Sequence, residues 1–155
     1  MRPRHPAVAI AVALAVAACS DDSPDRQAAI AERGEHVMPF DLATTTHRFE
    51  PTATGLVETV LADDPGDTEQ VTLVREHLRH EADRFRAGDY GDPATIHGED
   101  MPGLTELEAG AADIAIADEP VDAGARLTFT TADPALVDAL HRWARAQTTD
   151  HHTDG

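Results

Sequence analysis

Hydrophobic and polar positions along the chain predict two β-hairpins. Short runs rich in Thr, Val, Leu and Phe are bounded by turn residues, as in half-buried strands. The predicted strands cover residues 45–50, 55–62, 113–118 and 125–131, with turns at 51–55 and 119–124. Between the two hairpins, residues 98–103 are interpreted as a polar loop.

A helix is predicted after each hairpin. The first runs from about Thr68 to Ala87, with Asp67 as its N-cap and Gly88 as its stop signal. The second runs from Pro134, a residue that suits the first helical position, to about Thr148. The order ββαββα predicts an α+β fold, a four-stranded antiparallel sheet with two helices on one face.

Helical periodicity identifies the faces that we expect to be buried. The apolar stripe of the first helix consists of Val71, Val74, Leu78, Ala82 and Phe85. The stripe of the second helix consists of Leu136, Leu140 and Trp143, with Ala139 and Ala144 beside it. The side chains expected to lie away from the core are Leu73, His77, His80, Arg84 and His141.

The two halves of the chain share a spacing. Gly55 lies nine residues before the pair Asp64-Pro65, and Gly124 lies nine residues before the pair Asp133-Pro134. A strand lies between the glycine and the Asp-Pro pair each time, and a helix with a histidine follows. This indicates either a duplicated ββα unit or a chance similarity between two ordinary hairpin-helix units.

The N-terminus is typical of a bacterial lipoprotein signal peptide, residues 1–18, followed by a lipidated cysteine. Arg2 and Arg4 precede a thirteen-residue apolar run, which is shorter than the roughly 20 residues that a membrane-spanning helix needs. We therefore expect Cys19 to carry palmitate and to anchor an exported protein to the outer face of the cytoplasmic membrane or to the cell envelope. The alternative is an ordinary secretory signal with an unmodified Cys19.

Beyond the anchor we expect one domain on a flexible tether. Residues 19–34 are polar and charged, so they are assigned to the lipidated cysteine and a tether that has room for a turn of helix at residues 26–33. Residues 35–155 are assigned to a single α+β domain. Cys19 is the only cysteine in the chain. A disulfide or a thiolate metal site within one copy is therefore excluded.

The net charge restricts the partners. The formal net charge is −17, and loss of Arg2 and Arg4 with the signal leaves ten basic residues against 29 acidic ones. Such a field repels nucleic acid and attracts cations or basic partners. We therefore expect no nucleic-acid binding and, apart from the membrane, no partner that the sequence identifies.

Histidines are the residues that suggest a chemistry. His77 and His80 are three positions apart on a predicted helix, and His36 lies near the thioether of Met38, a combination that suits copper. A copper or zinc ion would need at least three ligands at about 2.0 to 2.1 Å. The candidate ligands are His47, His77, His80, His97 and His141, with His36, Met38, Asp41 and His151 as further candidates. The alternative is that histidine replaces lysine, which is missing from this chain, at the surface.

Catalytic motifs are scarce. The sequence contains no Gly-x-Ser-x-Gly elbow, no phosphate-binding glycine-rich loop, no His-Glu-x-x-His and no Cys-x-x-Cys. Ser20 and Ser23 are the only serines, so a serine nucleophile in the domain is excluded. Acid-base pairs remain open, such as Asp41 with His47.

Several short motifs resemble an uncharacterised family of exported bacterial domains, over roughly residues 35–155. They are Met38-Pro39-Phe40-Asp41, Thr45-Thr46-His47-x-Phe49, His77-Leu78-x-His80, Ile96-His97, Met101-Pro102-Gly103 and Asp150-His151-x-Thr153. The resemblance implies that His47, His77, His80, His97, His141 and His151 match the family pattern. Some members carry the label "aspartate carbamoyltransferase", which does not fit, because that enzyme has a Ser-Thr-Arg-Thr phosphate loop and two larger domains.

We therefore expect a lipid-anchored envelope protein with a small, non-catalytic binding domain, and a transition metal as the leading ligand. Two alternatives remain open at this stage. One is a small metal-dependent or acid-base enzyme that uses the same histidines, and the other is a structural or protein-interaction module. Convergence of at least three of the histidines would favour the metal-dependent hypotheses.

Overall fold

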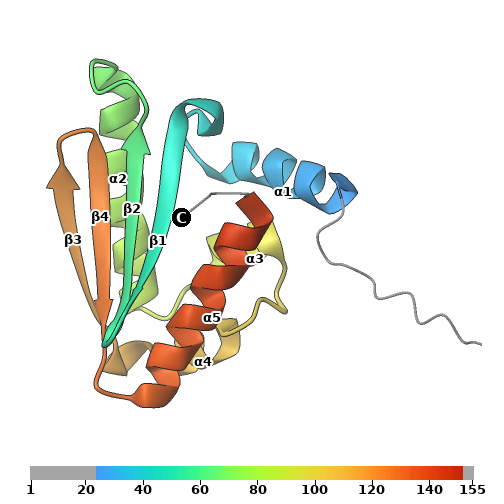
Figure 1. The fold of residues 1–155 in the computed structure, drawn as a ribbon, viewed down its shortest axis with the longest axis vertical. Coiled ribbons are helices and arrows are strands. Elements are labelled where there is room, and N and C mark those ends of the chain that lie inside the picture. The colour runs from blue at the N-terminus through green and yellow to red at the C-terminus, as the bar shows by residue number, and fades with distance from the viewer. Residues whose placement is uncertain (1–23, 152–155) are drawn as a thin grey trace, which may run out of the picture.

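A computed structural model describes residues 24–151, so the expected signal peptide and Cys19 lie outside the described residues. The predicted α+β class is confirmed: four antiparallel strands pair in the order β1-β2-β4-β3, with helices packed beside them (Figure 1). The strands are β1 (Thr45–Thr52), β2 (Gly55–Ala62), β3 (Ala115–Val121) and β4 (Gly124–Thr130).

Both hairpins are tighter than the sequence predicted. Thr52 pairs with Gly55 and Val121 pairs with Gly124, so each turn has only two residues between the strands. The longer turns predicted at 51–55 and 119–124 are wrong, because Pro51 and Pro120 lie inside strands. Both prolines belong to edge strands, where a missing N–H can face away from the ladder.

The two predicted helices cover one face of the sheet. Helix α2 (Thr68–Arg86) packs on β2, β3 and β4, and α5 (Pro134–His151) packs on β1 and β2. Asp67 caps α2 by accepting a hydrogen bond from the Gln70 N–H. The core residues predicted on both helices are buried, including Val74, Leu140 and Trp143. The opposite face of the sheet carries exposed side chains such as Arg48 and Glu50.

Helix α1 (Pro24–Val37) is longer than the turn of helix that the sequence suggested at residues 26–33. It packs against α5 and against the short helix α3 (Gly91–His97), as Figure 1 shows. Ile30 is 1% exposed, and Arg33 Nε donates a hydrogen bond to the Ile96 carbonyl at 2.7 Å. The expectation of a tether up to Gly34 is therefore wrong from Pro24 onward, because this segment buries the side chain of Ile30 in the domain.

The segment between α2 and the second hairpin is also more ordered than predicted. It contains α3, α4 (Leu104–Gly110) and a 3-10 turn at Ala111–Asp113. A second 3-10 turn, Leu42–Thr44, lies outside this segment, just before β1. Met101, inside the predicted polar loop 98–103, is 6% exposed. Gly103 has φ 91°, and a Cβ there would lie 2.4 Å from the Ala139 carbonyl oxygen. The loop is therefore closely packed on α5.

Candidate functional site

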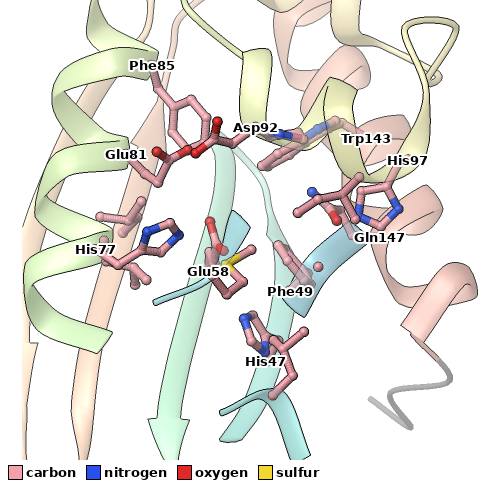
Figure 2. Close-up of a pocket in the computed structure, with 17 residues that line it drawn as sticks. His47, Phe49, Glu58, His77, Glu81, Phe85, Asp92, His97, Trp143 and Gln147 are labelled. Atoms are coloured by element: carbon pink, nitrogen blue, oxygen red, sulfur yellow. The ribbon is translucent and has the colours of Figure 1, made fainter. Parts of the chain in front are cut away.

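A cavity lies between the helix-covered face of the sheet and helices α1, α2, α3 and α5 (Figure 2). We call it the central cavity. Its volume is about 50 Å³, measured as the space open to the centre of a water molecule. Its apolar lining includes Met38, Leu42, Phe49, Leu78, Phe85, Ile96, Leu127 and Trp143, and its polar lining consists of His47, Glu58, His77, Glu81, Asp92, His97 and Gln147.

Glu58 is placed in this cavity by the alternation of β2. Along β2 the residues that face the helices are Leu56, Glu58, Val60 and Ala62, so a carboxyl interrupts an otherwise apolar face. Its partners on the neighbouring strands are Phe49 and Leu127. Within the described residues the Glu58 carboxyl makes no hydrogen bond or ion pair. Burial, followed by repulsion from Glu81, raises the pKa of Glu58 to about 8.

Helix α2 contributes His77 and, one turn later, Glu81. Burial lowers the pKa of His77 to about 4, so its imidazole is neutral at neutral pH. Burial and the nearby Asp92 raise the pKa of Glu81 to about 7. His77 was expected to lie away from the core, but it is half-buried and lines the cavity. Met38, just after α1, and Asp92, in α3, line the cavity with it.

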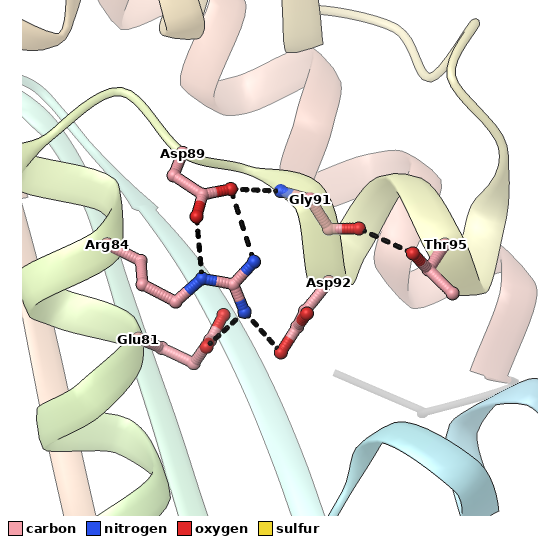
Figure 3. A network of polar contacts seen from close by, with 6 residues as sticks. All are labelled: Glu81, Arg84, Asp89, Gly91, Asp92 and Thr95. Atoms are coloured by element: carbon pink, nitrogen blue, oxygen red, sulfur yellow. Dashed lines mark hydrogen bonds and ion pairs between the residues drawn. The ribbon is translucent and has the colours of Figure 1, made fainter.

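Arg84 holds together the acidic groups at this end of α2 (Figure 3). Its guanidinium contacts three carboxylates: Glu81 at 3.1 Å, Asp89 at 2.9 Å and Asp92. The contact with Asp89 is bidentate and raises the pKa of Arg84 while it lowers the pKa of Asp89. The positive charge of Arg84 is thus more than balanced by its own neighbours.

Helix α5 contributes Trp143 and Gln147, both of which line the cavity. Gln147 is 6% exposed, and its side-chain amide makes no hydrogen bond to any described residue. The indole nitrogen of Trp143 is also buried and unpartnered. A fully buried polar atom without a partner is costly, so the Trp143 indole N–H indicates a place for water or a ligand.

Three of the five histidines in the predicted metal set, His47, His77 and His97, line the central cavity. The ring of Phe40 packs against both His47 and His77, with centroid distances of 5.9 and 5.5 Å. Among residues 24–151, no group of three or more His, Cys, Asp or Glu side chains is arranged to hold a metal ion. The condition that would favour copper or zinc, at least three converging histidines, is therefore not met by the described side chains, which lie around a cavity rather than at one point.

The other candidate ligands lie apart. His80 is exposed, and His141 Nε2 donates to the carbonyl oxygens of Thr52 and Gly55, each at 3.0 Å. His36 Nδ1 donates to the Glu32 carbonyl at 2.7 Å. Asp41 accepts a hydrogen bond from the Ala43 N–H and so caps a 3-10 turn. The side chain of His151 lies outside the described part of the chain.

Sequence reasoning missed Glu58, Glu81, Asp92, Trp143 and Gln147 as site residues. Glu58 could have been found from the sequence, because it is a charged residue on the face of a predicted strand that otherwise carries buried apolar residues. Gln147 follows Trp143 by four residues on α5, but its role depends on the packing of α1 on the domain and on helix α3, neither of which was predicted. Together these side chains give the cavity the composition of a small-molecule site, mostly apolar with a few convergent polar groups, at a volume far below the roughly 300 to 1,000 Å³ of pockets for drug-sized ligands.

Within residues 24–151, no helix combines the length and the apolar character that a membrane crossing requires. No protein-family model, curated protein or solved structure matches this chain, so its function has to be inferred from the cavity.

Proposed function

We propose that this chain is a lipid-anchored cell-envelope protein whose domain binds a small molecule in the central cavity without transforming it. The observation that carries this proposal is an apolar cavity lined by Glu58 and Gln147, whose side chains make no hydrogen bond to any described residue, beside the buried and unpartnered indole nitrogen of Trp143. Buried polar groups are normally satisfied, so a cavity with two such groups is suited to an occupant that supplies the missing partners.

The size of the cavity limits the occupant. One water molecule needs about 10 to 15 Å³ on the same measure, so 50 Å³ accommodates a few waters or a ligand of a few non-hydrogen atoms. A longer molecule would place only one end group there. The anchor is supported by the sequence signal at Cys19.

A screen with a matched pair of variants tests the binding function. Leu42→Trp places a bulky ring at the wall of the cavity, whereas Ala43→Trp places the same ring on the neighbouring exposed residue. Saturation-transfer NMR of the full chain against small molecules of up to about six non-hydrogen atoms should find binders. We expect Leu42→Trp to abolish this binding and Ala43→Trp to retain it. Absence of any binder, or equal binding by Leu42→Trp, would contradict the proposal.

An acid-base enzyme is the second candidate, and Glu81 is the residue that favours it. A pKa of about 7 is suited to a group that gives and takes protons near neutral pH, and neutral His77 lies one turn away. The same NMR screen detects turnover as new substrate-derived signals. Turnover that is lost in Glu81→Gln would support the enzyme, whereas unchanged ligand spectra over hours would leave binding as the activity.

A further inference from the structure

We propose that the central cavity selects the ammonium group of a small primary amine, with Glu58 and Gln147 as its hydrogen-bond acceptors. This inference rests on the proposed small-molecule function and adds the chemical class of the ligand. It is drawn from the hydrogen-bonding capacity, the aromatic lining, the charge and the size of the cavity.

The cavity offers two acceptors to a ligand that donates hydrogen bonds, besides the unpartnered indole N–H of Trp143. The Glu58 carboxyl and the Gln147 amide oxygen are acceptors that lack partners among the described residues. A primary ammonium carries three N–H donors and can serve both acceptors at once. A quaternary ammonium has no donor and would leave both groups unsatisfied.

The aromatic lining is also suited to a cation. Phe49, Phe85 and Trp143 come from three different elements and line the cavity together (Figure 2). The rings of Phe49 and Phe85 each lie 6.0 Å from the Trp143 ring in an edge-on arrangement. Aromatic faces attract ammonium groups, and the attraction is stronger in a site with little water.

The local charge disfavours an anion. Among the described residues, Arg84 is the cation that contacts the cavity carboxylates Glu81 and Asp92. Its charge is already shared by three carboxylates, because it also pairs with Asp89. His77 stays neutral, and the whole chain carries a formal net charge of −17. The resulting negative potential attracts a positively charged ligand.

Charge can be conserved when the cation enters. Because burial raises the pKa of Glu58 to about 8, its carboxyl holds a proton near neutral pH, and an ammonium ion can displace that proton. The titratable or charged groups around Glu58 are His47 from β1, His77, Glu81 and Arg84 from α2, and Asp92 and His97 from α3. The described cavity residues of α1, β4 and α5 are Gly34, Leu127, Trp143 and Gln147, which do not titrate.

A metal ion is a poorer occupant than an organic cation. A divalent metal needs at least three ligand atoms around one point, and the described side chains offer no such group. A primary ammonium needs fewer acceptors and gains from the apolar wall. The cavity volume matches two or three non-hydrogen atoms such as those of ethylammonium.

The chain contains its own reporter, because Trp143 is its only tryptophan and lines the cavity. Ethylammonium, the similarly sized ethanol, acetate and tetramethylammonium are titrated into the full chain at constant ionic strength, and the Trp143 emission is recorded. We expect a saturable change with ethylammonium, and only weak or non-saturating changes with the other three. This comparison needs no variant.

Variants then test the role of the carboxyl. Glu58→Gln keeps the shape and removes the charge, and we expect it to weaken ethylammonium binding by about tenfold or more. Glu50→Gln, an exposed position on the neighbouring strand β1, is the control and should bind as the parent does. Circular dichroism shows whether each variant is folded.

The outcomes separate the two proposals. Saturable binding of ethanol or acetate with no binding of ethylammonium would overturn the amine assignment and leave the small-molecule function in place. Equal ethylammonium affinity in Glu58→Gln and the parent would also overturn the assignment. No response to any small molecule, here and in the wider screen, would overturn both.

Discussion

At the scale of single residues, Glu58 departs most clearly from what its strand requires. Its neighbours on the same face of β2, Leu56 and Val60, are fully buried, and an apolar residue at position 58 would complete the face. A carboxyl there costs stability, since burial raises its pKa to about 8. Such local violations of the folding pattern are concentrated at functional positions.

The cost of Glu58 predicts how stability depends on pH. The unfolded chain releases the Glu58 proton near the ordinary pKa of 4.5, whereas the native state keeps it up to a pKa of about 8. The native state therefore binds more protons between these values, and its stability falls as the pH rises. Relative to the parent, Glu58→Gln should gain on the order of 1 to 4 kcal/mol between about pH 5 and pH 9.

Urea unfolding at several pH values measures this difference. His77 and Glu81 titrate in both proteins, so the comparison isolates Glu58, and Glu50→Gln serves as the exposed control. A constant difference between Glu58→Gln and the parent across this range would mean that Glu58 is not a buried acid.

Residue patterns predicted the helix cores well but not the opposite side of α2. The apolar stripe of α2 is buried as expected, because it lies on the sheet. His77 and Arg84 were expected to lie away from the core, because the periodicity of one helix does not show what packs over its other face. Glu81, at 5% exposure, is buried for the same reason.

At the scale of elements, the two hairpins are closely equivalent. A Cβ on Gly55 would lie 2.0 Å from the Phe129 carbonyl oxygen, and a Cβ on Gly124 would lie 2.0 Å from the Val60 carbonyl oxygen. Each glycine therefore allows close approach to the other hairpin across the β2-β4 pair. This equivalence explains the common spacing in the sequence, while a duplication remains a hypothesis.

Sequence reasoning missed α3 and α4 and anticipated α1 only as a turn of helix in the tether. Helix α1 is mostly polar, and its one fully buried large apolar side chain is Ile30. A single buried side chain does not produce the repeated apolar spacing by which helices are recognised. Helices α3 and α4 have seven residues each, too few for two turns of clear periodicity. The walls of the cavity that these helices supply could not be predicted for that reason.

Helix α1 provides a test of the fold. Ile30→Ala should destabilise the protein by about 2 to 4 kcal/mol, because it empties a fully buried position. Glu32→Ala, on the exposed side of the same helix, should change stability by less than about 0.5 kcal/mol. Chemical denaturation of the full chain measures both. If Ile30→Ala changes the free energy of unfolding as little as Glu32→Ala does, α1 does not pack on the domain. Residues 24–34 would then be a flexible tether, as the sequence predicted.

At the scale of the whole molecule, the proposed anchor would place the domain close to the membrane. Pro24, where α1 begins, is five positions after Cys19, and a chain of five residue steps reaches at most about 18 Å. The end of α1 and the residues that follow it contribute Gly34 and Met38 to the cavity wall. We therefore expect ligand capture to take place near the membrane surface.

Lipidation can be tested in a bacterial host that receives labelled palmitate. The full chain should carry the label and sediment with membranes, whereas Cys19→Ala should lose both properties, because it removes the only thiol. Ser20→Ala, which changes the adjacent residue, should keep the label. A parent chain without label would support the ordinary secretory signal instead.

The most direct test of the central claim is the ¹H–¹⁵N NMR spectrum of the full chain with and without a ligand found in the screen. The chain has a single indole N–H signal, from Trp143 in the cavity. The account predicts that this signal shifts together with the Gln147 side-chain amide, while amides near Arg48 and Arg126 on the opposite face of the sheet stay in place. Unchanged indole and Gln147 signals, with shifts confined to that opposite face, would contradict it.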